Sequence, residues 1–312
     1  MKILVFGPGG LGGYFGARLA ASGADVTFVA RGEHLNAIRA HGLRVESGLG
    51  NLALHPVKAT DDAASAGIVD FVMVGVKLWD TEAAVDALAP AVGPETAVAS
   101  FQNGVDAIDI LTRKFGRARV LGGVAHIATA IERPGVIRHL GTMQRLTFGE
   151  LDGRRSARAE RLLGLCRKAG IDAALTDDIE RAIWDKFVFI VGLSALTTLT
   201  RLPIGPIREE PLTRELLADV MREAAAVGRA KGVALDADSA EKQLAFIDTL
   251  PHPMIASMLG DLRRGNRLEL PWLSGAVARL GTALGVATPA NRFVCAALTL
   301  HANGRHPSAE PA

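Results

Sequence analysis

Closely spaced glycines near the start of the chain form the first feature that could do chemistry. They follow the apolar run of residues 3–6, and the segment reads Gly7-Pro8-Gly9-Gly10-Leu11-Gly12. After a strand and before a helix, this G-x-G-x-x-G spacing predicts a turn that binds the pyrophosphate of a dinucleotide. Gly7 permits the tight turn, Gly9 admits the phosphates to the backbone, and Gly12 lets the helix pack closely. Gly10 and Leu11, which lie between these glycines, are also expected to bind the cofactor. A glycine-rich turn alone is common, but the elements around this one favour nucleotide binding.

The end of the second expected strand, residues 25–30, selects between the two nicotinamide dinucleotides. An acidic side chain there binds a free ribose hydroxyl, whereas this strand ends in Arg31. A guanidinium donates planar, charge-assisted hydrogen bonds to a phosphate, so the sequence predicts NADPH as the cofactor. The alternative is a solvated surface arginine, and Glu33 two residues later is a mild counterargument.

Two further loops follow expected strands at the edge where open α/β sheets bind ligands. Lys77 follows residues 72–76, and Gln102-Asn103-Gly104 follows residues 98–101. Asn-Gly is first of all a turn signal, and a lysine at a strand end is usually just exposed. Their location at this edge nevertheless favours a role in ligand binding for both Lys77 and the Gln102-Asn103-Gly104 turn.

Several motifs, in order along the chain, resemble the ketopantoate reductase (2-dehydropantoate 2-reductase) family from residue 1 to about residue 300. They are the glycine loop with Arg31, Val-Lys-Leu-Trp around Lys77, Gln102-Asn103-Gly104, Trp184-Asp185-Lys186, and the block from Ser257 through Asp261 to Glu269. The resemblance implies a Rossmann domain followed by a helical domain, with NADPH and a 2-keto acid held between them. Members of the family reduce ketopantoate to pantoate on the route to pantothenate.

The resemblance also implies a role for each matching residue. Lys186 is the proton donor to the ketone oxygen, which suits hydride addition because negative charge builds on that oxygen. Asn103 lies near the nicotinamide ribose and the substrate, Ser257 binds the substrate, and Glu269 interacts with the cofactor and the lysine. Lys77 lies near the cofactor. Without the motifs, a lysine on a helix surface, a helix-capping serine and a solvated glutamate would be the better interpretations.

Two positions depart from the family pattern. Family members commonly carry asparagines four and eight residues after the catalytic lysine, where this chain has Ile190 and Ser194. We retain Ser194 as a substrate-binding residue, while Ile190 removes an amide and adds apolar surface. Ketopantoate is therefore the leading substrate, a different 2-keto acid is an alternative, and a non-catalytic NADPH-binding sensor is another. A 3-hydroxyacid dehydrogenase shares the glycine loop and a catalytic lysine, but the block from Ser257 to Glu269 argues against it.

The bulk composition excludes several other classes. The 312 residues carry a net charge of +2 with no stripe of one sign, which argues against a nucleic-acid partner. The two cysteines, Cys166 and Cys295, form no metal or disulfide pattern, so we expect no metal and a cytoplasmic location. We see no apolar stretch of about 18 residues, the length a membrane span needs. Exposed helix faces in the second half leave room for a homodimer.

The periodicity along the chain predicts an α/β N-terminal Rossmann domain with a mostly parallel sheet, followed by an all-helical C-terminal domain. Strands are expected at residues 3–6, 25–30, 71–76, 96–101 and 120–125, and antiparallel edge strands between 127 and 150. Helices are expected at 11–22, 81–89, 105–115, 156–169, 178–197, 210–232, 238–246 and 270–285. The predicted domains are residues 1–173 and 174–304, with a disordered tail from 305 to 312.

Overall fold

The computed structural model describes residues 1–305 and separates into two compact units. The first unit contains Met1–Gln102 and Asp106–Ile179. The second contains Asn103–Val105 and the described residues from Glu180 onward. This division falls later than the proposed boundary near residue 173, because strand β10 (Asp172–Leu175) still pairs with the sheet of the first unit. The proposed tail lies outside the described residues, apart from Arg305.

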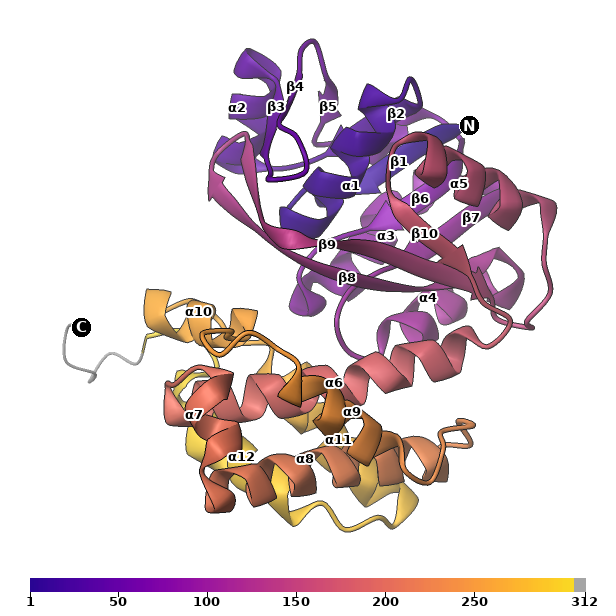
Figure 1. Cartoon of the computed structure of the whole chain (residues 1–312). Coiled ribbons are helices and arrows are strands. Elements are labelled where there is room, and N and C mark those ends of the chain that lie inside the picture. Colours follow the sequence, from indigo (N-terminus) through magenta and orange to yellow (C-terminus); the bar gives the residue numbers. More distant parts are fainter. Residues whose placement is uncertain (306–312) are drawn as a thin grey trace. The chain divides into compact units, whose positions relative to one another are not determined.

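One mixed sheet organises the first unit (Figure 1). Its strand order is β4-β3-β9-β8-β7-β6-β1-β2-β5, and β10 pairs with β9. The strands, besides β10, are β1 (Lys2–Phe6), β2 (Asp25–Val29), β3 (Leu43–Glu46), β4 (Leu52–Leu54), β5 (Lys58–Thr60), β6 (Val69–Val74), β7 (Val92–Ser100), β8 (Val120–Arg133) and β9 (Val136–Glu150). All neighbours from β5 to β8 run parallel, which confirms the predicted mostly parallel sheet.

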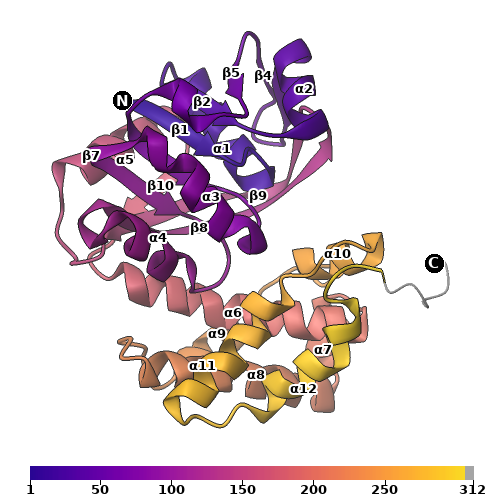
Figure 2. The ribbon, with the colours of Figure 1, turned by 180° about the vertical axis from the view of Figure 1, so that it is seen from behind.

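Helices cover both faces of this sheet, as continuous apolar strands require. Ile3 and Val5 pack in one buried cluster with residues of α1 (Gly10–Ala21), α2 (Gly32–His41) and α5 (Ala157–Lys168). Leu4, between them in β1, packs in the opposite cluster with α3 (Thr81–Leu88) and α4 (Ala107–Phe115). Figures 1 and 2 show α1 and α4 on opposite sides. Short 3-10 turns lie at Ala63–Ala66, Leu78–Asp80, Ala89–Ala91 and Arg117–Arg119.

The strands predicted between residues 127 and 150 are correct in direction but wrong in position. β8 and β9 form the expected antiparallel pair. They do not end the sheet, however, because β3 pairs parallel to β9 and β4 pairs with β3 beyond it. Strands β3, β4, β5 and β10 were not predicted, because each has only three or four residues, too few for a clear period. Helix α2 was not predicted either.

Helices and 3-10 turns are the only regular secondary structure among the described residues of the second unit, which confirms the predicted fold class. Its helices are α6 (Ile179–Thr200), which begins at the last residue of the first unit, α7 (Ile204–Glu209), α8 (Pro211–Ala230), α9 (Ser239–Asp248), α10 (Ser257–Arg264), α11 (Ser274–Leu284) and α12 (Pro289–Leu298), with 3-10 turns at Leu270–Trp272 and Thr299–His301. The prediction missed α7, α10 and α12, and it merged the turn at Leu270–Trp272 with α11. Trp184 and Phe187 of α6 are buried in the core of this unit.

Helix α6 corrects one statement about membranes. It has 22 residues, and its most apolar window has a mean hydropathy of 1.5, so among the described helices it is long and apolar enough to cross a membrane. The apolar stretch was missed because Asp185 and Lys186 interrupt it. Within the structure 61% of that window is buried, as in the core helix of a soluble protein, so the resemblance to a span is weak evidence.

A buried ion pair in the first unit leads to a stability prediction. Arg158 donates to both carboxylate oxygens of Glu150, at 2.7 and 2.6 Å, and Ser156 donates to one of them. Glu150 is 4% exposed. Burial alone would raise the pKa of Glu150, but the hydrogen bonds from Arg158 and Ser156 hold it below its ordinary value.

We predict that Glu150→Gln lowers the free energy of unfolding by roughly 1–3 kcal/mol at neutral pH, measured by urea denaturation, because Arg158 loses its charged acceptor. A depressed folded-state pKa stabilises only where the carboxyl group is ionised. The difference from the wild type should therefore vanish as the pH falls below about 4. The control is Glu160→Gln, which removes an exposed partner of Arg155 and should cost less than about 1 kcal/mol.

Candidate active site

The glycine loop joins β1 to α1, and two of its glycines are required by the protein itself. Gly7 has a φ of +88°, and a Cβ there would lie 2.7 Å from Cγ1 of Val76. A Cβ at Gly12 would lie 2.4 Å from the carbonyl oxygen of Gly7. The backbone N–H of Gly7 donates to the carbonyl of Val29 at 3.0 Å, which ties the loop to the end of β2. Gly7 and Gly12 therefore fix the shape of the turn.

Gly9 is different, because the protein leaves space beside it. A Cβ at Gly9 would have its nearest neighbour, the carbonyl oxygen of Gly75, at 3.9 Å, which is an ordinary contact. Gly9 is the N-cap of α1, with extended backbone and no side-chain cap, and the first turn of α1 has no acidic residue. Gly10 and Leu11 follow it, and a Cβ at Gly10 would lie 2.7 Å from the carbonyl oxygen of Thr129. Bare amides at this helix start fit a pyrophosphate.

The loop is also held by His34, which the sequence analysis missed. The backbone N–H of Gly135 donates to Nδ1 of His34 at 3.1 Å, so Nε2 carries the proton and donates to the carbonyl of Pro8 at 2.9 Å. Burial lowers the pKa of His34, while the hydrogen bond to Pro8 acts in the opposite direction. No local pattern marks this residue, because the two groups it joins lie far apart in the sequence.

Arg31 and Lys77 lie at the carboxyl ends of the strands that flank β1. Arg31 is the N-cap of α2, and its side chain is 85% exposed. It forms an ion pair with Asp80, with Nη2 and Oδ2 2.8 Å apart. Lys77 is exposed, and its ammonium nitrogen lies 5.5 Å from the centre of the Trp79 ring. Nothing in the local sequence singles out Asp80, because its partner Arg31 lies 49 residues away in the chain.

The loop after β7 is anchored by Gln102. Its Nε2 donates to the carbonyl of Val76 at 2.7 Å and to Oγ1 of Thr81 at 2.9 Å, while Ser100 donates to its Oε1. This fixes the chain immediately before Asn103, the first residue grouped with the second unit. Within the predicted motif, Gln102 therefore positions Asn103.

The second unit brings together three of the predicted residues. Nζ of Lys186 donates to Oδ1 of Asn103 at 2.8 Å. Burial lowers the pKa of Lys186 to about 8, and the negative charge of Glu269 opposes that shift. Glu269 is 7% exposed, so its charge acts where solvent screens little. A positioned ammonium group with a pKa near neutrality can donate a proton in a reaction.

The other predicted substrate contacts have different settings. Ser257 is exposed at the first residue of α10. Ser194 is 1% exposed on α6, two helical turns beyond Lys186. Its contact with a substrate stays a prediction. Ile190 lies one turn beyond Lys186, is partly buried, and packs against the core of the unit. No group of three or more acidic, histidine or cysteine side chains suited to a metal occurs among residues 1–305.

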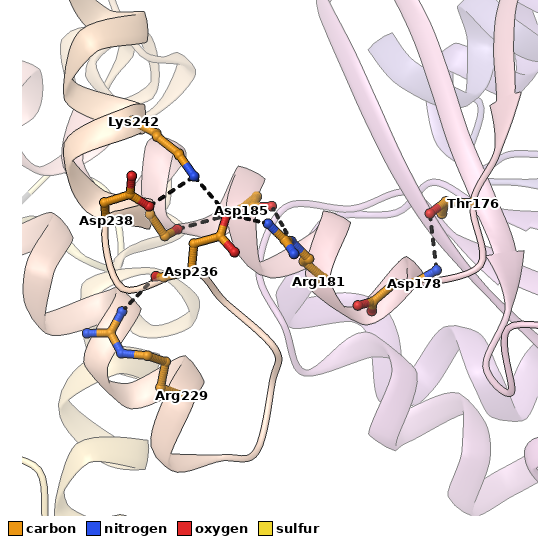
Figure 3. A network of polar contacts seen from close by, with 9 residues as sticks. Thr176, Asp178, Arg181, Asp185, Arg229, Asp236, Asp238 and Lys242 are labelled. Atoms are coloured by element: carbon orange, nitrogen blue, oxygen red, sulfur yellow. Dashed lines mark hydrogen bonds and ion pairs between the residues drawn. The ribbon is translucent and has the colours of Figure 1, made fainter.

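The helix segment that carries Lys186 is held from two sides. Trp184 and Phe187 are buried in an edge-to-face pair with ring centres 5.2 Å apart. On the polar side, Asp185 accepts a hydrogen bond from Ser239 at 3.1 Å and lies 3.6 Å from the guanidinium of Arg181. Figure 3 shows how this pair continues to the start of α9 through Asp236, Asp238 and Lys242, with Arg229 donating to the backbone of Asp236. These contacts fix the start of α6.

Both units match the same known family. Residues 3–153 match the family described as ketopantoate reductase PanE/ApbA, and residues 178–302 match its C-terminal domain. The chain belongs to the ketopantoate reductase family. Membership confirms the resemblance seen in the sequence and makes the protein an oxidoreductase that acts on a 2-keto acid.

Individual relatives agree with this assignment over nearly the whole chain. A 2-dehydropantoate 2-reductase of Mesorhizobium japonicum is 35% identical over 311 residues, covering 93% of this chain and 94% of the relative. The crystal structure of a PanE/ApbA family ketopantoate reductase from Ralstonia eutropha JMP134 has a TM-score of 0.88 at 33% identity, covering 97% of this chain and 98% of that one. A D-mandelate dehydrogenase with NADH and anilino(oxo)acetate has a TM-score of 0.88 over 97% and 98% of the chains, but at 22% identity it shares the fold alone.

The setting of Lys186 leads to a pH prediction. We expect kcat/KM for keto-acid reduction to fall about tenfold per pH unit above pH about 8, because the group must be protonated to donate. Glu269→Gln removes the charge that raises the lysine pKa, so its falling limb should move to lower pH. The control Glu241→Gln, which removes an exposed partner of Arg222, should leave the profile unchanged. Identical limbs in the wild type and Glu269→Gln would contradict the assignment.

Proposed function

We propose that this chain catalyses the NADPH-dependent reduction of a 2-keto acid to a 2-hydroxy acid. The leading substrate is 2-dehydropantoate, with pantoate as the product, in cytoplasmic pantothenate biosynthesis. The observation that carries this proposal is the part-buried ammonium group of Lys186, with Asn103 at 2.8 Å and the charge of Glu269 acting on it. A lysine that only covers a helix surface would not be expected to combine a fixed partner with a pKa of about 8.

The residues around the glycine loop fit a nicotinamide dinucleotide. Gly9 has space beside it, and the amides of Gly10, Leu11 and Gly12 lie at the start of α1. Arg31 and Lys77 provide positive charge at the neighbouring strand ends for the ribose phosphate, which favours NADPH. When bound, the dinucleotide supplies the hydride.

The side chains of the second unit supply the proton and hold the group that gives it. As the keto carbon becomes tetrahedral, its oxygen gains negative charge, which the Lys186 ammonium stabilises and then protonates. Asn103 fixes the position of Nζ through its amide oxygen. Glu269 keeps the lysine protonated by raising its pKa against the effect of burial. The neutral amine left after the reaction takes up a proton from solvent.

The face of α6 favours a second candidate substrate. Ile190 stands where the family commonly has an amide, one turn from Lys186, and it offers no hydrogen bond to a hydroxyl group. A site that binds a polar substituent without a partner for it loses affinity, whereas an apolar side chain would gain contact. A 2-keto acid with an apolar side chain is therefore the alternative to ketopantoate.

The test is to measure NADPH oxidation by the purified protein with a panel of 2-keto acids. The panel contains ketopantoate and keto acids with branched apolar side chains, and kcat/KM ranks them. The highest value with ketopantoate would support the leading substrate, and the highest value with an apolar keto acid would support the alternative. Tight NADPH binding without turnover of any compound would identify a non-catalytic sensor instead.

We predict that Lys186→Ala lowers kcat on the best substrate by roughly 10²- to 10⁴-fold while keeping most of the NADPH affinity, because the glycine loop is unchanged. Lys168→Ala, which removes an exposed lysine at the last residue of α5, is the matched control and should keep full activity. An equal loss of turnover and of NADPH binding in Lys186→Ala would show that the lysine is structural.

We predict that Arg31→Ala weakens NADPH binding by roughly ten- to a hundredfold and NADH binding much less, because only NADPH carries the phosphate that the guanidinium would bind. Fluorescence titration with each cofactor measures both dissociation constants. Arg39→Ala is the matched control, since Arg39 lies on α2, the helix whose N-cap is Arg31, and pairs with Asp61. An unchanged preference in Arg31→Ala would remove the reason for choosing NADPH.

A further inference from the structure

An ion pair spans the strand end that carries the glycine loop. The sheet order β6-β1-β2 places β1 between the other two, and all three run parallel. Arg31 follows β2, Asp80 follows β6, and their side chains meet with Nη2 and Oδ2 2.8 Å apart. Because Gly7 leaves the strand between them, this pair lies beside the dinucleotide loop.

The two partners are held to different degrees. The backbone N–H of Asp80 donates to the carbonyl of Lys77 at 2.9 Å, so Asp80 sits in a fixed turn, and its side chain is 28% exposed. The side chain of Arg31 is 85% exposed. A carboxylate and a phosphate both bind a guanidinium through planar pairs of oxygens, so they compete for the same donors.

We propose that Asp80 is a specificity-determining residue that competes with the ribose 2′-phosphate for Arg31. This inference rests on the proposed NADPH site. The carboxylate holds the guanidinium beside the loop in the free protein, and a phosphate must displace it to bind. Asp80 therefore weakens the binding of NADPH but not that of NADH. It thereby reduces the preference for NADPH over NADH that Arg31 creates.

Another ion pair of the same unit provides a matched comparison. Lys58 and Asp25 are 2.7 Å apart and join the first residues of β5 and β2. That pair lies at the amino ends of the strands, whereas the glycine loop follows a carboxyl end. Asp25→Asn thus makes the same chemical change as Asp80→Asn, with the same change in net charge, away from the proposed phosphate site.

The experiment measures calorimetric binding of 2′,5′-ADP and 5′-AMP, which differ by the phosphate in question and need no keto acid. The proteins are the wild type, Asp80→Asn, Asp80→Ser, Asp25→Asn, Arg31→Ala and the double variant Arg31→Ala/Asp80→Asn. We expect both Asp80 variants to bind 2′,5′-ADP roughly three- to tenfold more tightly than the wild type at low ionic strength. The gain should shrink as salt is added, and Asp25→Asn should show none.

Three results would overturn the proposal. They are unchanged or weaker binding of 2′,5′-ADP by the Asp80 variants, an equal gain for 5′-AMP, and a full gain that persists in the Arg31→Ala background. A wild type that binds no 2′,5′-ADP while Asp80→Asn does would support it strongly. Absence of binding in both would refute the phosphate site and this inference together, whereas failure on every keto acid would refute the proposed reaction and leave the competition standing.

Discussion

The partial burial of one ammonium group is the constraint on which the proposed chemistry of the second unit depends. In water the pKa of a lysine is too high for efficient proton donation near neutral pH. Deep burial without partners would lower that pKa so far that the lysine would be neutral. Lys186 lies between these extremes, because burial lowers its pKa to about 8 while Glu269 acts against that change. Asn103 then sets the position of Nζ. The position of the ammonium group and its pKa are therefore set by different neighbours, Asn103 and Glu269.

Such a balance requires a backbone that does not shift, and helix α6 provides it. Helices α6 and α8 pack so closely that two positions between them have room only for glycine. A Cβ at Gly192 would lie 2.7 Å from Cγ of Met221, and one at Gly228 would lie 2.7 Å from the Trp184 ring. The helix is apolar because it forms the core of its unit, which also explains why it resembles a membrane span in composition. The charged pair of Arg181 and Asp185 then fixes its start.

The sequence was sufficient where the signal was local. The strand, turn and helix around Gly7 follow from periodicity and from steric needs of single residues, and the fold class follows from the change of pattern along the chain. It failed where position depends on distant partners. The three-residue strand β4 has no readable period, and nothing local indicates that Asp80 meets Arg31 or that His34 holds Pro8. The burial of Ser194 likewise comes from the packing of whole helices.

In the proposed cofactor site of the first unit, different residues bind the dinucleotide and select its type. Gly7 and Gly12 are required by the fold, whereas the space beside Gly9 fits the pyrophosphate that every nicotinamide dinucleotide carries. The loop alone therefore cannot distinguish NADPH from NADH. We propose that charged side chains at the neighbouring strand ends make that distinction, and Arg31 among them is exposed and can be substituted without disturbing a core. The proposed substrate preference depends instead on α6, so a substitution at either site could alter one preference and keep the other.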